Sequence, residues 1–470
     1  MIKFFLDQFG CAKNQVDGEL IISRLKAMNL EQTSEPQDAD IIIINSCGFI
    51  ESAKTESLNA VMDSRTNYPK AKILLAGCLA ERYAEVFSSD LPEVDGIMGN
   101  GDLSVIDRII QPLLDGKRPV EKPEQTGVCC GSRSDFLSFP GSAYVKITEG
   151  CDNCCSFCAI PLIRGNLRSR TEDEIVEEIK ELLSKGVFEI NLVGQDSAAY
   201  GMDGQPPHNP EIWQAFDGTS SVNLSPLASL LKKISALEGN FWIRILYIHP
   251  DHFPLDILPV IAKDKRLLPY FDIPFQSGSD QIIRAMNRTG NKEQYINLVK
   301  KIRSVFSETE YKNIALRTTF LTGFPTESNK DASSTEAFLK EIKPDWSGCF
   351  TYSQEDDTPA AEMRKQVPSK VAAKRAGTLQ QIQLQITADA LKARCGKSYD
   401  VLVEEIISGG DGEGTGLAIG RAWFQAPDVD GAVVIRYDLD SDKAAEIQAG
   451  KVVNIMITGT SGVDMTGELL

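Results

Sequence analysis

Residues 149–161 read EGCDNCCSFCAIP, and three cysteines of this run, Cys151, Cys155 and Cys158, form a compact C-x3-C-x2-C pattern. Three thiolates can bind three irons of a 4Fe-4S cluster and leave the fourth iron open, whereas an electron-transfer cluster normally has four cysteine ligands. The open iron can bind a substrate or a cofactor. Three cysteine ligands therefore predict a reaction at this cluster and not electron transfer alone. A structural zinc site is the alternative, but it needs a fourth ligand. Cys154 is too close to Cys155 to bind the same metal easily, and the three histidines of the chain are distant in sequence.

A second set of three cysteines, Cys11, Cys47 and Cys78, is spread along the first part of the chain. Each follows a short apolar run that we expect to be a buried parallel strand; the runs are IKFFLDQ at 2–8, ADIIIIN at 39–45 and AKILLAG at 71–77. Because ligands bind at the carboxyl ends of parallel strands, three loops of this kind would meet at one edge of the sheet. The spacing therefore predicts a second metal site.

The remaining cysteines lack such a placement, and we interpret them as ordinary small apolar residues; they are Cys129, Cys130, Cys349 and Cys395. Eleven cysteines without an export signal favour a reducing, cytoplasmic compartment and metal ligation over disulfides. The apolar runs are too short to span a bilayer.

The alternation of apolar runs and amphipathic stretches predicts four parts of the chain. Residues 1–125 form an open parallel α/β domain, and residues 137–368 carry six βα repeats that suggest an incomplete parallel barrel. Residues 369–394 form one connecting helix, and residues 395–470 form a small β-barrel. Residues 202–223 are interpreted as an inserted surface loop.

The charge of the chain bears on its partner. The net charge is −17, and residues 395–470 alone contain thirteen Asp and Glu against five Lys and Arg. Nucleic-acid binding usually depends on a basic surface, so this balance disfavours RNA and favours a basic protein. The alternative interpretation is that the acidic surface only confers solubility.

Several runs resemble the radical S-adenosylmethionine (SAM) methylthiotransferases. The N-terminal runs are QFGCAKNQVDGE (8–19), NSCGFIESAK (45–54) and LAGCLAERY (75–83). The barrel runs are GCDNCCSFCAIPLIRGNLRSR (150–170), GQDSAAYG (194–201), DIPFQSGSDQIIRAMNR (272–288), TTFLTGFPTE (318–327) and YSQEDDTPAA (352–361). The last 75 residues resemble a TRAM domain. AKNQVDGE after Cys11 and GFIESAK after Cys47 resemble the RimO type within this family.

The resemblance implies an activity: methylthiolation of the β-carbon of an aspartate in small-subunit ribosomal protein twelve. It implies two 4Fe-4S clusters with three cysteine ligands each, and SAM as the source of a 5′-deoxyadenosyl radical. It also implies a flavodoxin- or ferredoxin-type reductant, a sulfur donor and no membrane partner. Two alternatives stay open: a MiaB-like transfer-RNA adenosine methylthiotransferase, and a non-catalytic iron–sulfur or RNA-binding module.

The resemblance also places candidate SAM contacts, and it implies no catalytic residue beyond the cluster ligands. Arginine can bind a carboxylate through two hydrogen bonds, so we expect contacts with SAM or with a substrate aspartate near 164–170, where a salt bridge at the barrel rim is the alternative. The glycines at the strand ends are equally explained by tight turns. The candidate residues are Arg164, Ser169, Arg170, Gly194, Gln195, Asp196, Gly323 and Glu327.

Overall fold

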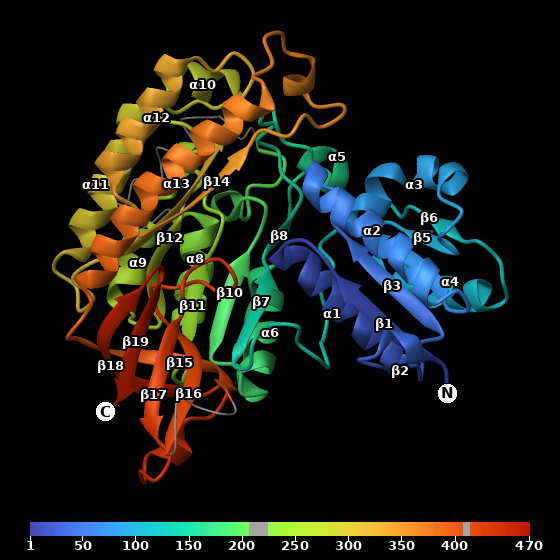
Figure 1. Cartoon of the computed structure of the whole chain (residues 1–470), viewed down its shortest axis with the longest axis horizontal. Coiled ribbons are helices and arrows are strands. Elements are labelled where there is room, and N and C mark those ends of the chain that lie inside the picture. The colour runs from blue at the N-terminus through green and yellow to red at the C-terminus, as the bar shows by residue number, and fades with distance from the viewer. Residues whose placement is uncertain (206–223, 408–413) are drawn as a thin grey trace.

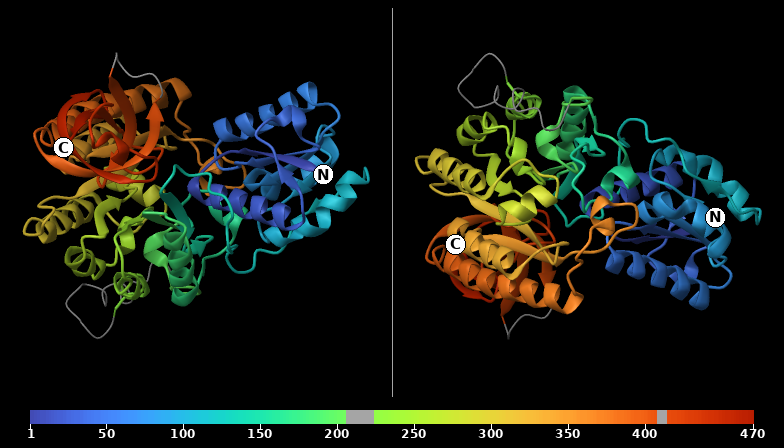
Figure 2. Two further views of the ribbon diagram at one scale, coloured as in Figure 1. Left: turned by 90° about the horizontal axis from the view of Figure 1, so that it is seen from below. Right: turned by 90° about the horizontal axis from the view of Figure 1, so that it is seen from above.

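The computed structural model describes residues 1–205, 224–407 and 414–470, so most of the expected loop at 202–223 lies outside the described residues. Figure 1 shows an N-terminal α/β part, a central βα part and a C-terminal β-barrel packed below it. In both views of Figure 2 the N-terminal part lies to one side of the other two. The predicted fold class is confirmed.

The N-terminal sheet has six parallel strands in the order β2-β1-β3-β4-β5-β6. Its central strand β3 (Ile41–Ser46) is buried at every residue, which explains the run of four isoleucines. The other strands are β1 (Lys3–Gln8), β2 (Glu31–Gln32), β4 (Lys72–Gly77), β5 (Gly96–Met98) and β6 (Val120–Glu121). The helices are α1 (Ala12–Ala27), α2 (Glu51–Asn67), α3 (Cys78–Asp90) and α4 (Ile106–Leu114).

The central sheet has six parallel strands in the order β14-β13-β12-β11-β10-β7, an open (β/α)6 arrangement. The strands are β7 (Ser142–Lys146), β10 (Glu189–Val193), β11 (Trp242–Ile245), β12 (Leu267–Asp272), β13 (Ala315–Thr322) and β14 (Trp346–Thr351). The helices around it are α5 (Ile160–Arg164), α6 (Glu172–Ser184), α8 (Pro226–Ser235), α9 (Ile257–Lys263), α10 (Asp280–Ala285), α11 (Lys292–Phe306) and α12 (Asn329–Ile342). A two-stranded ribbon, β8 (Thr148–Glu149) with β9 (Arg168–Ser169), flanks the loop that carries the compact cysteines.

One strand lies earlier than expected. The apolar run at 271–276 predicts a strand there, but β12 ends at Asp272. Pro274 has no backbone N–H to donate and interrupts the ladder, so that only an isolated bridge between Gln276 and Phe320 continues it.

The long helix α13 (Ser369–Lys392) packs against β14 and leads into a closed five-stranded barrel. Its strands run in the order β15-β16-β17-β19-β18. They are β15 (Ser398–Ile407), β16 (Thr415–Ala422), β17 (Val433–Asp438), β18 (Val452–Ser461) and β19 (Asp464–Leu469).

The C-terminal barrel is attached to the central sheet by buried charges. Arg421 donates to Glu189 over 2.6 Å, and Arg244 donates to the same carboxylate over 2.7 Å. Glu404 pairs with Arg421 at 2.6 Å, and the indole of Trp346 donates to the Phe424 carbonyl at 2.7 Å. Removal of one partner from such a buried network leaves an uncompensated charge, so the interface fixes one orientation of the two parts.

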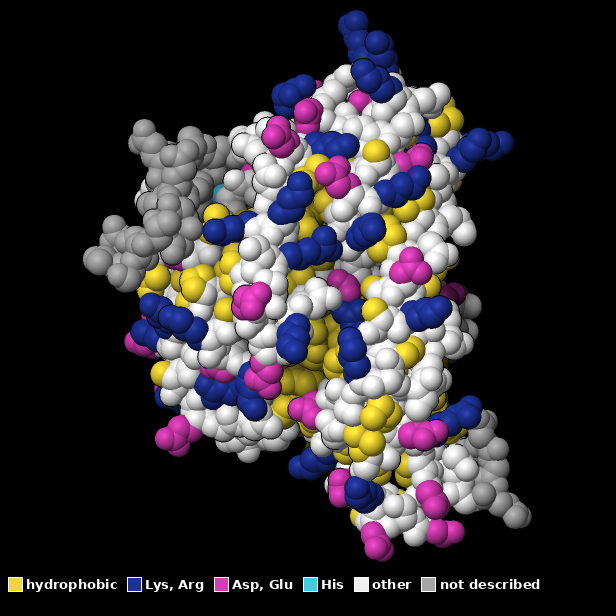
Figure 3. Space-filling view, turned by 90° about the vertical axis from the view of Figure 1, so that its left-hand side faces the viewer, with side chains coloured by type: hydrophobic (Ala, Val, Ile, Leu, Met, Phe, Trp, Pro, Cys, Tyr) yellow, Lys and Arg dark blue, Asp and Glu magenta, His cyan; other side chains and the backbone are white. Residues whose placement is uncertain are grey.

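Charge is unevenly spread over the face drawn in Figure 3. Figure 3 shows many Lys and Arg side chains over the barrel helices and several Asp and Glu toward the lower end, on the C-terminal barrel. The exposed acidic residues of that barrel include Asp400, Glu405, Asp438, Asp440, Asp442, Glu446 and Glu468. Part of its acidic excess is instead used in the interface, since Glu404 is buried there. In the described part of the chain, no helix is both long and apolar enough to cross a membrane.

Candidate functional site

The three spread cysteines lie at the carboxyl ends of three neighbouring strands. Cys11 immediately precedes α1, Cys47 follows β3 directly, and Cys78 is the first residue of α3 after β4. The side chain of Asn14 connects their loops, because its Nδ2 donates to the carbonyls of Phe9, Asn45 and Ser46 at 2.8–3.3 Å. Its Oδ1 lies 3.9 Å from the Cys78 sulfur. Asn14 thus ties the loop that carries Cys11 to the end of the strand that precedes Cys47, next to the Cys78 sulfur.

Two glycines allow this close approach. Gly10 has φ +89°, and a Cβ built on it would lie 3.0 Å from the Cβ of Cys47 and 3.2 Å from its sulfur. A Cβ on Gly48 would lie 2.8 Å from the Cys78 carbonyl oxygen. A side chain at either position would push two of the cysteine loops apart.

Nearby donors and charges act on these thiols. Arg164 Nη2 and Asn100 Nδ2 donate to the Cys78 sulfur at 3.2 and 3.5 Å. Burial and the neighbouring Cys78 raise the pKa of the Cys47 thiol to about 12. Although Cys11 as a whole residue is exposed, the protein around its sulfur acts to raise the pKa of Cys11, but the charges of Lys13 and Arg164 and nearby backbone N–H groups outweigh this effect and lower that pKa. Cys11, Cys47 and Cys78 are therefore close enough to influence one another and share one cationic neighbour, Arg164.

The compact cysteines lie in the loop between β8 and α5. Asn153 Nδ2 donates to the Cys151 sulfur at 3.4 Å and to the Asp196 carboxylate at 2.7 Å. Asp196 also lies 2.5 Å from His252 Nε2, and these partners hold its pKa well below its usual range although burial opposes this. Burial and the neighbouring Cys155 raise the pKa of Cys158 to about 12. The loop after β10 is thus joined to the cysteine loop through one asparagine.

A 4Fe-4S cluster and a single metal ion require different arrangements of their ligands. Within residues 1–205, 224–407 and 414–470, no three His, Cys, Asp or Glu side chains lie close enough together to hold one metal ion. A cluster requires a wider arrangement, because each of three cysteines binds a different iron. Beside the compact set, three polar atoms have no hydrogen-bond partner in the described structure although they are buried: Thr148 Oγ1, Asn153 Oδ1 and Gln195 Oε1. Such atoms normally bond to a ligand or water, so this edge fits a polar cofactor.

A closed square of buried charges joins the two parts that carry the cysteines. Lys146 pairs with Asp17 at 2.5 Å and with Glu149 at 2.9 Å. Arg164 pairs with the same carboxylates, at 2.9 Å for Asp17 and 2.7 Å for Glu149. No side chain of the four is more than 6% exposed. Because Asp17 lies on α1 and the others lie on β7, β8 and α5, the square fixes the N-terminal sheet against the barrel.

Lys13 forms a second connection between the two parts. Its Nζ donates to the carbonyl oxygen of Gly194 at 3.1 Å and lies 3.9 Å above the centre of the Tyr247 ring. The lysine is only 6% exposed. Its charge lowers the pKa of Cys11 in one set and acts in the same direction on Cys158 in the other, so it lies within electrostatic reach of both.

The candidate SAM contacts occupy different surroundings. Gly194, Gln195 and Asp196 follow β10 beside the compact cysteines, and Gln195 donates to Glu149 at 3.1 Å. Arg164 belongs to the charge square, which matches the salt-bridge alternative and leaves its contact with a ligand a prediction.

The other candidates are engaged with protein groups. Arg170 pairs with Glu178, and Ser169 donates to Asp203 at 2.6 Å. At the end of β13, the N–H of Gly323 donates to Glu327, which pairs with Arg375 of α13 at 2.6 Å. These contacts stay predictions too.

Sequence reasoning missed several residues of this site. Asn14, Asp17 and Lys13 stand in the same run as Cys11, CAKNQVDGE, and that run is the only signal that could have found them. Asn153 lies between two cysteines of the compact set and could have been selected on position alone. Glu149 carries no sequence signal, since its role depends on contacts with distant residues.

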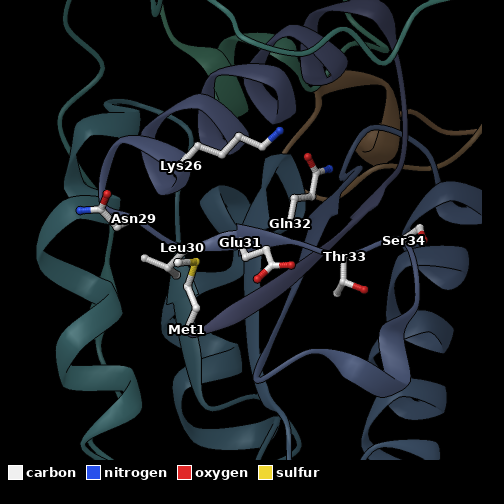
Figure 4. Close-up of a pocket in the computed structure, with 8 residues that line it drawn as sticks. All are labelled: Met1, Lys26, Asn29, Leu30, Glu31, Gln32, Thr33 and Ser34. Atoms are coloured by element: carbon white, nitrogen blue, oxygen red, sulfur yellow. The ribbon is translucent and has the colours of Figure 1, made fainter.

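A separate groove lies at the edge of the N-terminal sheet (Figure 4), lined by residues of β2 and the end of α1. In Figure 4 the amino group of Lys26 and the carboxylate of Glu31 are among the side chains along it. It shares no residue with either cysteine set, so it is not part of this site.

Three family models match the chain. Residues 3–99 match the uncharacterized protein family UPF0004, residues 145–339 match the radical SAM superfamily, and residues 395–470 match the TRAM domain. The three matches follow the order of the two cysteine-bearing parts and the C-terminal barrel.

Among curated proteins, the chain is 51% identical to the ribosomal protein uS12 methylthiotransferase RimO of Treponema denticola, over 98% of this chain and 99% of that protein. It is 36% identical to the protein of the same name from Pelotomaculum thermopropionicum, over 99% of each.

Among solved structures, the chain resembles the radical SAM methyltransferase TsrM of Kitasatospora setae with tryptophan and a SAM analogue bound. The TM-score is 0.51 at 9% identity, over 82% of this chain and 89% of that one. A likeness at this identity supports the fold alone.

Proposed function

The chain belongs to the RimO family of ribosomal protein uS12 methylthiotransferases, and on that premise we propose how its two cysteine sets and its barrel perform this reaction. It is a radical SAM methylthiotransferase that acts on ribosomal protein uS12. We propose that the acceptor is the β-carbon of an aspartate. That carbon is unactivated, so acid–base catalysis or an ordinary nucleophile would not suffice, and the cofactor must supply the reactivity.

The cofactors are SAM and an iron–sulfur cluster. We propose two 4Fe-4S clusters, one on Cys151, Cys155 and Cys158 and one on Cys11, Cys47 and Cys78. When bound, the first would supply the electron that makes SAM reactive, and the second would supply a coordination position for sulfur. Three thiolates per cluster leave one iron open in each, as both roles require.

The chain's own residues position and enclose the reactants. The unpaired buried atoms of Thr148, Asn153 and Gln195 support the assignment of SAM to the edge formed by β7 and β10. Asn153 fixes the cysteine loop to Asp196, and we propose the 194–196 turn as a SAM contact. The remaining proposed SAM contacts are Arg164, Ser169, Arg170, Gly323 and Glu327. Of these, Arg164 belongs to the charge square and donates to the Cys78 sulfur.

One observation carries the proposal: the buried square of Lys146, Asp17, Arg164 and Glu149 locks the two cysteine-bearing parts together. A reaction that needs two metal centres on one carbon depends on such a fixed arrangement, because a displacement of about 1 Å can cost about a hundredfold in rate.

We propose three partners for the reaction: a basic protein substrate, a reductant and a sulfur donor. The exposed acidic residues of the C-terminal barrel favour a basic protein substrate, since complementary charge increases the association rate. A flavodoxin- or ferredoxin-type reductant would supply the electron, and a sulfur donor would supply the inserted atom.

The test uses the reconstituted enzyme under anaerobic conditions with uS12, SAM and a reductant. Cys155→Ala is expected to abolish SAM cleavage, and Cys47→Ala to preserve cleavage but yield no methylthiolated uS12 by mass spectrometry. Cys395→Ala serves as the control, because this half-buried cysteine lies in neither set. Product formation by the Cys47→Ala enzyme would refute the role of the N-terminal cluster.

A further inference from the structure

The ammonium group of Lys13 is buried at the junction of the two cysteine-bearing parts without an acidic partner. In the described structure its Nζ donates to the Gly194 carbonyl and faces the ring of Tyr247, and it forms no ion pair with a carboxylate. An ammonium group has three N–H donors, so the Gly194 bond leaves two of them for other acceptors.

The cations around Lys13 are in a different situation. Arg164 and Lys146 each pair with both Asp17 and Glu149. Arg317 on β13 lies 3.4 Å from a carboxylate oxygen of Asp272. Arg164, Lys146 and Arg317 are thus paired with carboxylates, whereas Lys13 is not.

The two remaining N–H donors of this buried ammonium need acceptors, and an anionic ligand between the two cysteine sets would supply them. Two features give a ligand access to it. Cys11, two residues before Lys13, is exposed, and the Tyr247 side chain beneath the ammonium is partly exposed. Tyr247 also has φ +61°, a strained backbone conformation of the kind that persists at functional sites.

We propose that Lys13 is the binding site for a carboxylate of the reaction's participants, and specifically for the side-chain carboxylate of the substrate aspartate. This inference rests on the proposed function. A charge-assisted bond from Lys13 to that carboxylate would hold the adjacent β-carbon between Gly194, at the barrel edge assigned to SAM, and Cys11 of the second cysteine set. The same contact would reject an asparagine, which carries no charge.

SAM also has a carboxylate, so the experiment separates the two sources. The holoenzyme is titrated with uS12 and with a uS12 variant in which the modified aspartate, located by mass spectrometry, is replaced by asparagine. The unmodified enzyme is expected to bind uS12 about 10- to 100-fold more tightly than the asparagine variant, the range typical of a hydrogen bond to a charged group. SAM affinity is measured in parallel without uS12.

Lys13→Met and Lys13→Gln are both expected to reduce this preference to less than about threefold, with SAM affinity unchanged. Glutamine keeps N–H donors for the Gly194 carbonyl, so a loss of preference in Lys13→Gln reports the missing charge and not a missing structural bond. Lys26→Met is the matched control, since Lys26 lies on the same helix and pairs with Asp135 at 2.6 Å. It should retain the full preference.

Two results would overturn the inference. The first is a preference that persists in both Lys13 variants, and a loss of SAM affinity in the same variants would then assign the carboxylate to SAM. The second is a failure of the enzyme without substitutions to methylthiolate uS12, which would refute the proposed function and the inference together.

Discussion

Replacement of Asp17 by asparagine tests whether the charge square fixes the two cysteine-bearing parts. Asp17 accepts from Lys146 at 2.5 Å and from Arg164 at 2.9 Å, and its side chain is 2% exposed. After the substitution two buried cations share only Glu149. The removal of one partner from a buried ion pair costs about 3–5 kcal/mol.

The assay is thermal unfolding together with limited proteolysis of the linker between the two parts. A loss of about 3–5 kcal/mol corresponds to a fall of roughly 6–20 °C for a cooperative unit of about 150–250 residues. Because Asp17 lies at the contact between the parts, faster cleavage between residues 115 and 141 should accompany the fall. Methylthiolation of uS12 should decrease more than SAM cleavage, since only the former needs both cysteine sets.

Asp107→Asn is the matched control on the same part of the chain. Asp107 pairs with Arg24 at 3.0 Å, but both side chains are largely exposed, and such pairs contribute about 0–1 kcal/mol. The double variant Asp17→Asn/Lys146→Met should recover about 1–3 kcal/mol, because the excess cation is removed. If Asp17→Asn costs no more than Asp107→Asn, or if the double variant is simply additive, the square does not hold the parts together.

Three further predictions concern other parts of the fold. Burial opposes ionisation of Glu189, but Arg421 and Arg244 lower its pKa to about 2, so the ionised carboxylate stabilises the folded state fully above its unfolded pKa near 4.5 and loses this effect as pH falls toward 2. In urea unfolding, the difference in free energy of unfolding between the unmodified protein and Glu189→Gln should shrink by about 3 kcal/mol from pH 6 to pH 2. A difference that stays constant over this range would contradict the prediction. Gly48→Val should separate the Cys47 and Cys78 loops, because its Cβ would lie 2.8 Å from the Cys78 carbonyl oxygen; iron analysis should show about four irons per chain in place of about eight, and full iron content would count against the arrangement. A chain ending at residue 394 should expose the buried Trp346, Arg244 and Glu189 and bind a hydrophobic dye, and a soluble chain that binds no dye would show that the C-terminal barrel is not needed to cover them.

The sequence predicts the fold and the cysteine sets because both depend on local patterns. The isoleucines at 41–44 are typical of a strand buried on both faces, and each of the three spread cysteines follows an apolar run of this kind. The contacts that complete the site are not local. Lys13 and Gly194 are 181 residues apart, and Asp17 and Lys146 are 129 apart, so no spacing or periodicity could pair them. For Arg164 the sequence left a ligand contact and a salt bridge open, and only the packed structure shows the salt bridge.

The contact between Arg421 and Glu189 has a consequence for biosynthesis. The two residues are 232 positions apart, so Glu189 leaves the ribosome long before its partner has been translated. Domains generally fold from the N-terminus as they emerge. Until the C-terminal barrel has been made, the nascent central barrel therefore carries the Glu189 carboxylate at a surface that is buried only in the completed chain. Truncated products of interrupted translation that lack the C-terminal barrel therefore retain an open end of the central barrel with the Glu189 carboxylate uncovered.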